Sequence, residues 1–347
     1  MNRSVTLDIL RGVAILLVVG RHYEYPGLAY RIGWCGVDLF FVLSGFLISG
    51  LLFKEYRCSG SLDLKRFWIR RGFKIYPAFY ALMVFVVVDY VALGKLTRHI
   101  FSDLFFLQDY IPPIAEHGWS LGVEEKFYLV LPILLLILVR LGKNKSDPFK
   151  LIPYLFIAIF AGCLALRAHA LLSGRLWYEI AQPAHLRMDG LFAGVTLGYY
   201  QEFRPDVFRR AGTLPLWILG LILLLPVPFF NLNTPMMLTL GLSTTLLGFA
   251  TLLLWSVNQA CPNWLLFSLI AWVGRYSYSI YLWNWVIRSK FRDPDSTWLV
   301  LSLPIYIALS IGVGWLMAYL VETPFLGLRE KYFPASSRVL RAPIRSE

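Results

Sequence analysis

Ten stretches of predominantly apolar residues recur along this chain, and they constrain its fold more than any other feature. An α-helix needs about 20 such residues to cross the roughly 30 Å hydrocarbon core of a bilayer. Backbone groups within the bilayer must be hydrogen-bonded internally, so the sequence predicts helices rather than open sheets. The predicted spans are 5–23, 32–53, 75–93, 119–140, 151–173, 185–201, 213–230, 236–257, 267–287 and 298–321.

The predicted fold is therefore all-α: a polytopic membrane helix bundle of about ten transmembrane helices, with no separate soluble domain. Only 16% of the residues are charged, whereas about a quarter are charged in a typical soluble domain. The apolar run 101–107 is too short to span and is expected to be interfacial or re-entrant. We expect no cleavable signal sequence. We divide the chain into a membrane domain, 1–325, and a basic cytoplasmic tail, 326–347.

The distribution of basic residues predicts the orientation. With the N-terminus in the cytoplasm, the inner segments hold 20 lysines and arginines and the outer segments hold 7. This asymmetry favours both termini inside. Basic loops facing anionic lipid account for the net charge of +12, so membrane lipid is an expected partner and nucleic acid is not. The four cysteines lie in different segments without metal-ligand spacing, so no metal site is expected.

Three polar side chains interrupt the first apolar stretch: Asp8, Arg11 and His22. A charge at membrane depth costs roughly 2.5–3.5 kcal/mol on insertion scales, and its default interpretation is functional. At 3.6 residues per turn, Arg11 and His22 return to nearly the same helix face, about 16 Å apart along the axis. Asp8 lies one turn before Arg11. One helix face is thus predicted to carry an acid, a fixed cation and an imidazole.

Five further spans also carry polar groups. Asp38 needs a cation, and the arginines are the candidates. Arg187 and Asp189 are two residues apart and share no helix face, so each is expected to pair with another helix. Arg275 and Ser277 lie in the ninth span. Polar residues in six spans predict a shared polar interior, either a pore or an active site.

A cluster of cations, Arg66, Arg70, Arg71 and Lys74, precedes the third span. Three of them are spaced by four residues, so on a helix they would make one cationic stripe at the cytoplasmic surface. Two interpretations remain open. The stripe either sets the membrane orientation and contacts lipid headgroups, or it binds the phosphates of a cytosolic donor. The planar guanidinium fork of arginine suits phosphate binding.

The fourth span opens with Ser120, Glu124 and Glu125. Helix capping and the helix dipole account for one of the two glutamates but less well for the pair. In the predicted orientation this span starts at the outer face, where the first span ends at His22. Either glutamate is therefore a candidate carboxylate partner for that imidazole.

Taken in order, six stretches resemble the integral membrane acyltransferase-3 family. They are Leu7–Gly12 with His22, Gly36–Phe46, Arg66–Pro77, Trp119–Tyr128, Arg187–Gly190 and Gly274–Ser277. The resemblance implies a bacterial inner-membrane O-acyltransferase of about ten helices. Its members move an acyl group, usually acetyl from cytosolic acetyl-CoA, to a sugar hydroxyl of a glycan, glycolipid or exopolysaccharide. Some members carry an added extracytoplasmic hydrolase-like domain, for which this chain is too short.

Two positions depart from the family pattern. Lys74 stands where arginine is usual, which keeps the charge but loses the bidentate fork. Asn284 stands near a position that is histidine in some members.

The resemblance and the residues together predict which residues bind the donor, which catalyse the transfer and which form a polar network. The CoA phosphates are assigned to Arg66, Arg70, Arg71 and Lys74. His22 is the expected general base, with Glu124 fixing its tautomer, and Asp8 orients Arg11. A covalent acyl-histidine intermediate is the other option. A polar network for substrate or structure is assigned to Asp38, Glu125, Arg187, Asp189, Arg275 and Ser277.

A transporter or flippase of a lipid-linked saccharide without acyl transfer is the alternative function, because it also needs intramembrane charges. An inactive relative that acts as a structural subunit is a third. The acceptor, the acyl chain and the oligomeric state stay open.

Overall fold

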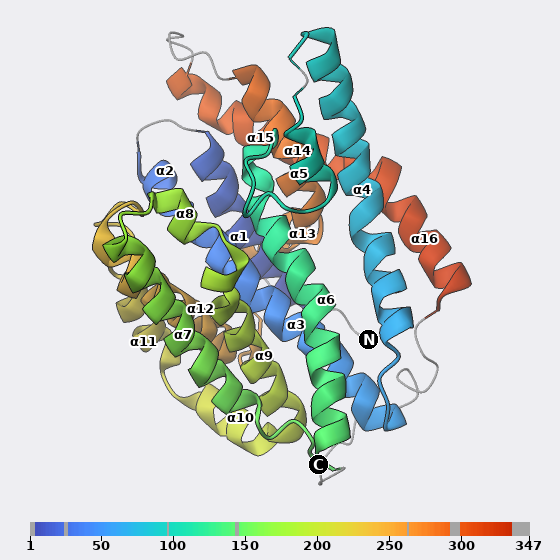
Figure 1. Ribbon diagram of the computed structural model, residues 1–347, viewed down its shortest axis with the longest axis vertical. Coiled ribbons are helices and arrows are strands. Elements are labelled where there is room, and N and C mark those ends of the chain that lie inside the picture. The colour runs from blue at the N-terminus through green and yellow to red at the C-terminus, as the bar shows by residue number, and fades with distance from the viewer. Residues whose placement is uncertain are drawn as a thin grey trace.

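A computed structural model describes residues 4–23, 27–95, 97–142, 146–261, 264–291 and 299–334. Its described residues form helices, turns and loops without a strand, which confirms the all-α membrane bundle (Figure 1). Each of the ten predicted stretches contains helix, although in the stretch 213–230 the helix α11 covers only Leu216–Leu224. The main helices are α1 (Val5–His22), α3 (Cys35–Ser59), α4 (Leu64–Ala92), α6 (Trp119–Leu141), α7 (Ile152–Leu172), α9 (Met188–Phe203), α12 (Leu242–Val257) and α15 (Leu299–Met317).

By length and composition, five segments of the described chain qualify as membrane spans, and a bent pair would make a sixth. The five are Cys35–Ser59, Leu64–Ala92, Ile152–Leu172, Met237–Val257 and Leu303–Tyr332. The bent pair is α10 (Pro205–Thr213) with α11 (Leu216–Leu224), which meet at 74°. The predicted number of about ten spans is thus not confirmed. Helices α1 and α6 are long enough to cross, but each carries at least three charged side chains.

The ninth predicted span is two helices, α13 (Leu265–Arg275) and α14 (Ser277–Phe291), interrupted at Tyr276. The last one continues beyond α15 through a π-helical turn, η4 (Ala318–Glu322), into α16 (Thr323–Tyr332). The first residues of the predicted tail are therefore helical. Residues 335–347 of that tail, and with them three counted arginines, lie outside the described residues. So do Arg3, Lys143, Lys145 and Arg292.

Short helices gather in the upper half of the bundle in Figure 1. Among them are α2 (Leu28–Ile32), α5 (Ile100–Leu104) and α8 (Trp177–Ala181), whereas α10 lies at the opposite end. The apolar run 101–107 forms the end of α5 and the turn after it, as its length predicts. Two 3₁₀ turns, η1 (Glu116–Gly118) and η2 (Ala184–Leu186), lead into α6 and α9.

Glycines bring two pairs of helices into close contact. A Cβ added to Gly45 of α3 would overlap the carbonyl oxygen of Leu191, and one on Gly194 of α9 would overlap that of Val42. Gly274 of α13 lies equally close to the Asp8 carbonyl of α1. Small residues allow such approach because dispersion contacts, not hydrophobic exclusion, hold helices together in lipid.

Two buried ion pairs tie four helices together. Arg187, just before α9, bonds Asp38 of α3 at 2.6 Å. Arg167 of α7 bonds Asp189 of α9 at 2.7 Å, and it also donates to the Ser243 hydroxyl of α12 at 2.8 Å. The predictions that Asp38 takes an arginine and that Arg187 and Asp189 pair with other helices are confirmed. The sequence analysis did not single out Arg167, although it is a charge within an apolar segment.

Replacing Arg167 by Met should destabilise the fold by about 3–5 kcal/mol, because it leaves the Asp189 carboxylate buried without its cation. The measurement is the free energy of unfolding of the detergent-solubilised protein. Adding Asp189→Leu should recover most of the loss. In the exposed pair Arg209–Asp206, Arg209→Met should cost less than about 1 kcal/mol. Equal effects of the two single substitutions would contradict the structural role of Arg167.

Candidate functional site

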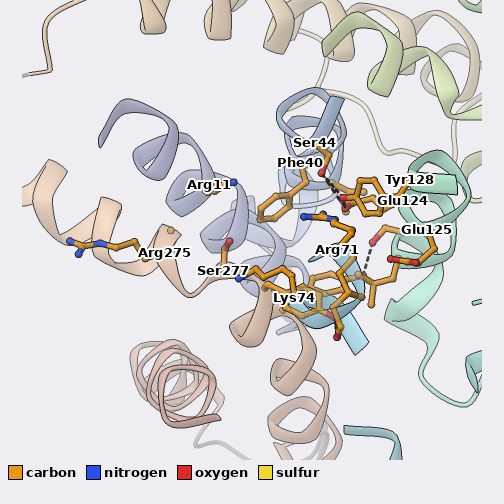
Figure 2. A pocket seen from close by; sticks show the side chains of 17 residues that line it. Arg11, Phe40, Ser44, Arg71, Lys74, Glu124, Glu125, Tyr128, Arg275 and Ser277 are labelled. Atoms are coloured by element: carbon orange, nitrogen blue, oxygen red, sulfur yellow. Dashed lines mark hydrogen bonds between the residues drawn. The ribbon is translucent and has the colours of Figure 1, made fainter. Parts of the chain in front are cut away.

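Two adjoining pockets lie among the polar residues of the bundle. The first, which we call the charged pocket, is a cavity of about 150 Å³ between α1, α3, α4, α6 and the α13–α14 junction. Its polar side chains come from helices far apart in sequence (Figure 2). They are Arg11, Ser44, Arg71, Lys74, Ser120, Glu124, Glu125, Tyr128, Arg275, Ser277, Tyr278 and Tyr281.

The wall formed by α6 carries the two carboxylates. Glu124 accepts hydrogen bonds from the hydroxyl groups of Ser44, at 3.1 Å, and of Tyr128. The Arg71 guanidinium lies 4.0 Å from the centre of the Tyr128 ring, a cation–π contact that holds it beside Glu124 (Figure 2). Glu125 accepts from a tyrosine of α4 through one oxygen; its other oxygen is buried and has no partner among the described residues.

Four cations from other helices line the same pocket, but they differ in how far their charge is already paired and in where their side chains point. Arg11 bonds Asp8 at 3.3 Å and stays about one-third exposed, as expected from the sequence. Lys74 pairs with the buried Glu322, which also accepts from the Ser279 hydroxyl at 2.8 Å. The Arg275 side chain points away from the cluster in Figure 2. Arg71 therefore has the most central position.

Two members of the predicted cationic stripe contact the C-terminal helix instead. Arg70 makes two hydrogen bonds to Glu330 of α16, at 2.9 and 3.3 Å, and a third to the Phe333 carbonyl. Arg66 donates to the carbonyl of Pro334. Helix packing thus separates residues that the four-residue spacing grouped together. Of the four predicted phosphate ligands, Arg71 and Lys74 line the charged pocket.

The second cavity, which we call the histidine pocket, measures about 310 Å³. His22 at the end of α1 and His117 of η1 face each other there edge to face, with ring centres 5.8 Å apart. Its other polar lining residues are Arg21, Tyr30, Glu116, Gln182, Arg187 and Arg288. Both ring nitrogens of His117 are buried and lack a hydrogen-bond partner among the described residues.

The hydrogen bonds around Asn284 define which nitrogen of His22 carries the proton. The Asn284 amide nitrogen donates to Tyr306 and to Ser310, at 2.8 and 2.9 Å. The Ser310 hydroxyl donates its proton to a backbone carbonyl, so it can only accept from Asn284. The amide nitrogen, not the amide oxygen, must therefore face Ser310. The amide oxygen then faces His22 Nδ1 at 2.6 Å and accepts its proton. His22 Nε2 is thereby left as the basic nitrogen.

Glu124 and His22, expected to pair, line different pockets. Val37 of α3 lines both pockets and forms part of the wall between them. Tyr281 lines the charged pocket, with its ring centre 6.4 Å from that of His22. Its hydroxyl donates to the His117 carbonyl and accepts from Ser120 at 2.8 Å. The two pockets thus meet at this tyrosine and Val37.

The predicted network residues divide accordingly. Arg187 lines the histidine pocket and is held there by Asp38, while Glu125, Arg275 and Ser277 line the charged pocket. Asp189 lies behind them, in the pair with Arg167. His117 and Tyr281 were missed as site residues; the position of His117 at the start of the same helical segment as Glu124 was a usable signal. Among the described residues, no group of three or more His, Cys, Asp or Glu side chains is arranged to hold a metal ion.

Comparison with known proteins gives one family. The family model described as "Acyltransferase domain" matches residues 5–319. The peptidoglycan O-acetyltransferase OatA of Listeria monocytogenes is 28% identical over 81% of this chain and 49% of its own length. The O-acetyltransferase OatA of Staphylococcus aureus is 27% identical over 95% of this chain and 58% of its own length. The chain therefore spans about half to three-fifths of these relatives. No solved structure matches it.

Proposed function

We propose a function from one premise: this chain belongs to the integral membrane acyltransferase-3 family, whose model covers nearly its whole length. The proposed activity is O-acyl transfer, with acyl-CoA, most simply acetyl-CoA, as donor and a glycan hydroxyl as acceptor. One observation carries the proposal. His22 lines one pocket with Nε2 as its basic nitrogen, and that pocket adjoins a second one lined by cations.

The charged pocket fits the donor. CoA carries phosphates, and guanidinium and ammonium groups are the side chains that bind phosphate best. Arg71 is the principal candidate, supported by Lys74 and Arg11. The positive-inside distribution puts this pocket on the cytoplasmic side of His22 in the proposed topology, where acyl-CoA is made. Because Arg66 and Arg70 contact the C-terminal segment, we assign them a smaller part in donor binding.

The histidine pocket fits the acceptor, and His22 is the proposed general base. Its Nε2 takes the proton of the acceptor hydroxyl while the oxygen attacks the thioester carbonyl. The C–O bond forms, the C–S bond breaks, and His22 returns the proton to the leaving sulfur, so the products are an ester and the free thiol. Asn284, rather than Glu124, holds the required tautomer. The positive charge of Arg187 and Arg288 would stabilise the developing oxyanion.

The names of the relatives suggest the class of acceptor. Listeria monocytogenes OatA is named a peptidoglycan O-acetyltransferase. We therefore propose a cell-wall glycan as the acceptor of this chain and acetyl as the transferred group, on the outer side of a bacterial cell membrane with both termini inside.

The test of the function is transfer of labelled acetyl from acetyl-CoA to peptidoglycan fragments by the purified protein in lipid vesicles. His22→Ala should lower kcat by about 10²–10⁴-fold, the usual contribution of a general base. His99→Ala, at an exposed histidine outside both pockets, is the matched control. Wild-type turnover by His22→Ala would refute the assignment. Saccharide transport without any acetylation would favour a transporter.

Asn284→Leu should lower kcat about 100-fold with little change in the KM for acetyl-CoA, because His22 loses the acceptor that fixes its tautomer. Steady-state kinetics with both substrates varied separates the two parameters. Leucine keeps the branched shape of the side chain without its polar atoms, and Asn233→Leu at an exposed asparagine provides the control. If Asn284→Leu changed only the donor KM, the proposed role would be wrong.

Arg71→Met should raise the KM for acetyl-CoA by about 10–100-fold, the equivalent of losing a charge-assisted hydrogen bond of about 1.5–3 kcal/mol. Arg70→Met should raise it less, since Arg70 is bound to Glu330. Arg140→Met, at an exposed arginine at the end of α6, should leave it unchanged. A larger effect of Arg70 than of Arg71 would mean that α16 moves aside and the donor binds on the outer face of α4.

A further inference from the structure

A third cavity extends the histidine pocket toward the surface. This cavity, the outer groove, measures about 920 Å³ and runs between the segment around Gln108–Pro113 and the segment that contains α8. It shares Glu116, Trp177 and Gln182 with the histidine pocket, so the two cavities adjoin at these three side chains. The volume is at the upper end of the range for small-molecule sites, about 300–1,000 Å³.

Hydrogen bonds hold the two sides of the outer groove in a fixed relation. The Asp109 carboxylate bonds the Lys126 ammonium at 2.5 Å and accepts from the backbone N–H of Ala184 at 3.1 Å. Tyr110 stacks on His185 across the same gap, and its hydroxyl lies 2.9 Å from His185 Nδ1. The contacts of Asp109 with Ala184 and of Tyr110 with His185 join the two segments, so the walls of the outer groove are held in place relative to each other.

Aromatic side chains are displayed at the rim of the groove. Trp177 and Tyr178 of α8 are exposed, whereas Ile180 and Ala181 of the same short helix are buried against Leu238. The helix is therefore anchored by one side while its indole and phenol rings face outward. Exposed aromatic rings in a cavity lined by both polar and apolar side chains suit a ligand with apolar C–H faces and many hydroxyls, which is the chemistry of a saccharide.

Each cavity also has, among its lining residues, a buried polar side chain with atoms that lack a hydrogen-bond partner among the described residues. Gln108 lines the outer groove and is 2% exposed; its side chain lies against Gly118 and Gly122 at the start of α6, and its carbonyl oxygen has no such partner. His117 lines the histidine pocket and is 4% exposed; one side of its ring interacts with the backbone of Leu282, and its ring nitrogens are otherwise without a partner among the described residues. Buried polar atoms are rarely left unpaired, so such groups mark positions for ligand hydroxyls.

We propose that the acceptor is an oligosaccharide of at least two sugar units, bound across both cavities. One unit lies in the histidine pocket against His22 and His117. At least one further unit lies in the outer groove, stacked on Trp177 and Tyr178 with a hydroxyl donating to Gln108. This inference rests on the proposed function and deepens it: the protein selects a polymeric glycan over a monosaccharide by contacts remote from the reacting hydroxyl.

The experiment compares peptidoglycan fragments of one, two and four sugar units as acceptors for the full-length protein in lipid vesicles, with acetyl-CoA as donor. For the wild type, the KM of the four-sugar fragment should be at least 10-fold below that of the single-sugar fragment. Trp177→Ala and, separately, Gln108→Leu should each reduce this ratio to less than threefold. Trp217→Ala, at an equally exposed tryptophan outside the groove, should keep it. The donor KM of each variant reports whether the charged pocket is still folded.

Each outcome has a distinct meaning. Equal KM values for all fragment lengths in the wild type would overturn the inference and leave the acyltransferase function standing. The inference would also be overturned if Trp177→Ala and Gln108→Leu kept the wild-type ratio of the KM values for the single-sugar and four-sugar fragments while the donor KM stayed unchanged. Failure of the wild type to acetylate any fragment would contradict the proposed acceptor, and the inference with it.

Discussion

The buried ion pair between Asp38 and Arg187 is the contact on which the arrangement of both pockets depends. Asp38 directly follows Val37, the residue of α3 that lines both cavities. Arg187 lies in the wall of the histidine pocket, and its guanidinium is also within cation–π distance of Phe41 and Trp119. A charge can be kept in an apolar bundle only when it is paired in this way. The pair thereby fixes α3, α6 and the start of α9 around a common wall.

Different functional groups line the two sides of that wall. One pocket combines Arg71, Lys74 and Arg11 with two glutamates that are themselves hydrogen-bonded, so its excess of cations suits a phosphorylated donor. The other contains two imidazoles, of which Asn284 orients one. A hydroxyl acceptor needs a base of this kind, and a CoA donor needs phosphate ligands. The proposed reaction joins them at the boundary formed by Val37 and Tyr281.

Much of this could be predicted from the sequence. Apolar length gave the helical segments, because lipid leaves the backbone no alternative to internal hydrogen bonds. The cost of an intramembrane charge identified Asp8, Arg11, Asp38 and His22 as residues that need partners. The number of spans is less accessible: the charges of α1 and α6 and the 74° bend between α10 and α11 make length and composition ambiguous there.

Contacts between helices far apart in the chain could not be predicted in the same way. The spacing of Arg66, Arg70 and Lys74 describes one helix face, but not which residues α16 would place against it. Depth along the membrane made a pair between His22 and Glu124 plausible, yet the rotation of each helix about its axis turns Glu124 toward Ser44 of α3 and Asn284 toward His22. The depth of a side chain in the membrane follows from its position in the sequence. The direction in which it points around the helix axis depends on how the helices pack.

The central claim is that donor and acceptor occupy pockets on opposite sides of one wall. The most direct measurement is the sidedness of transfer in sealed vesicles that hold the protein in one orientation, with labelled acetyl-CoA on the Arg71 side and peptidoglycan fragments only on the other. The account predicts labelled glycan on the side opposite the donor, at a rate that depends on His22. Product formed only when both substrates are on the same side of the bilayer would contradict it.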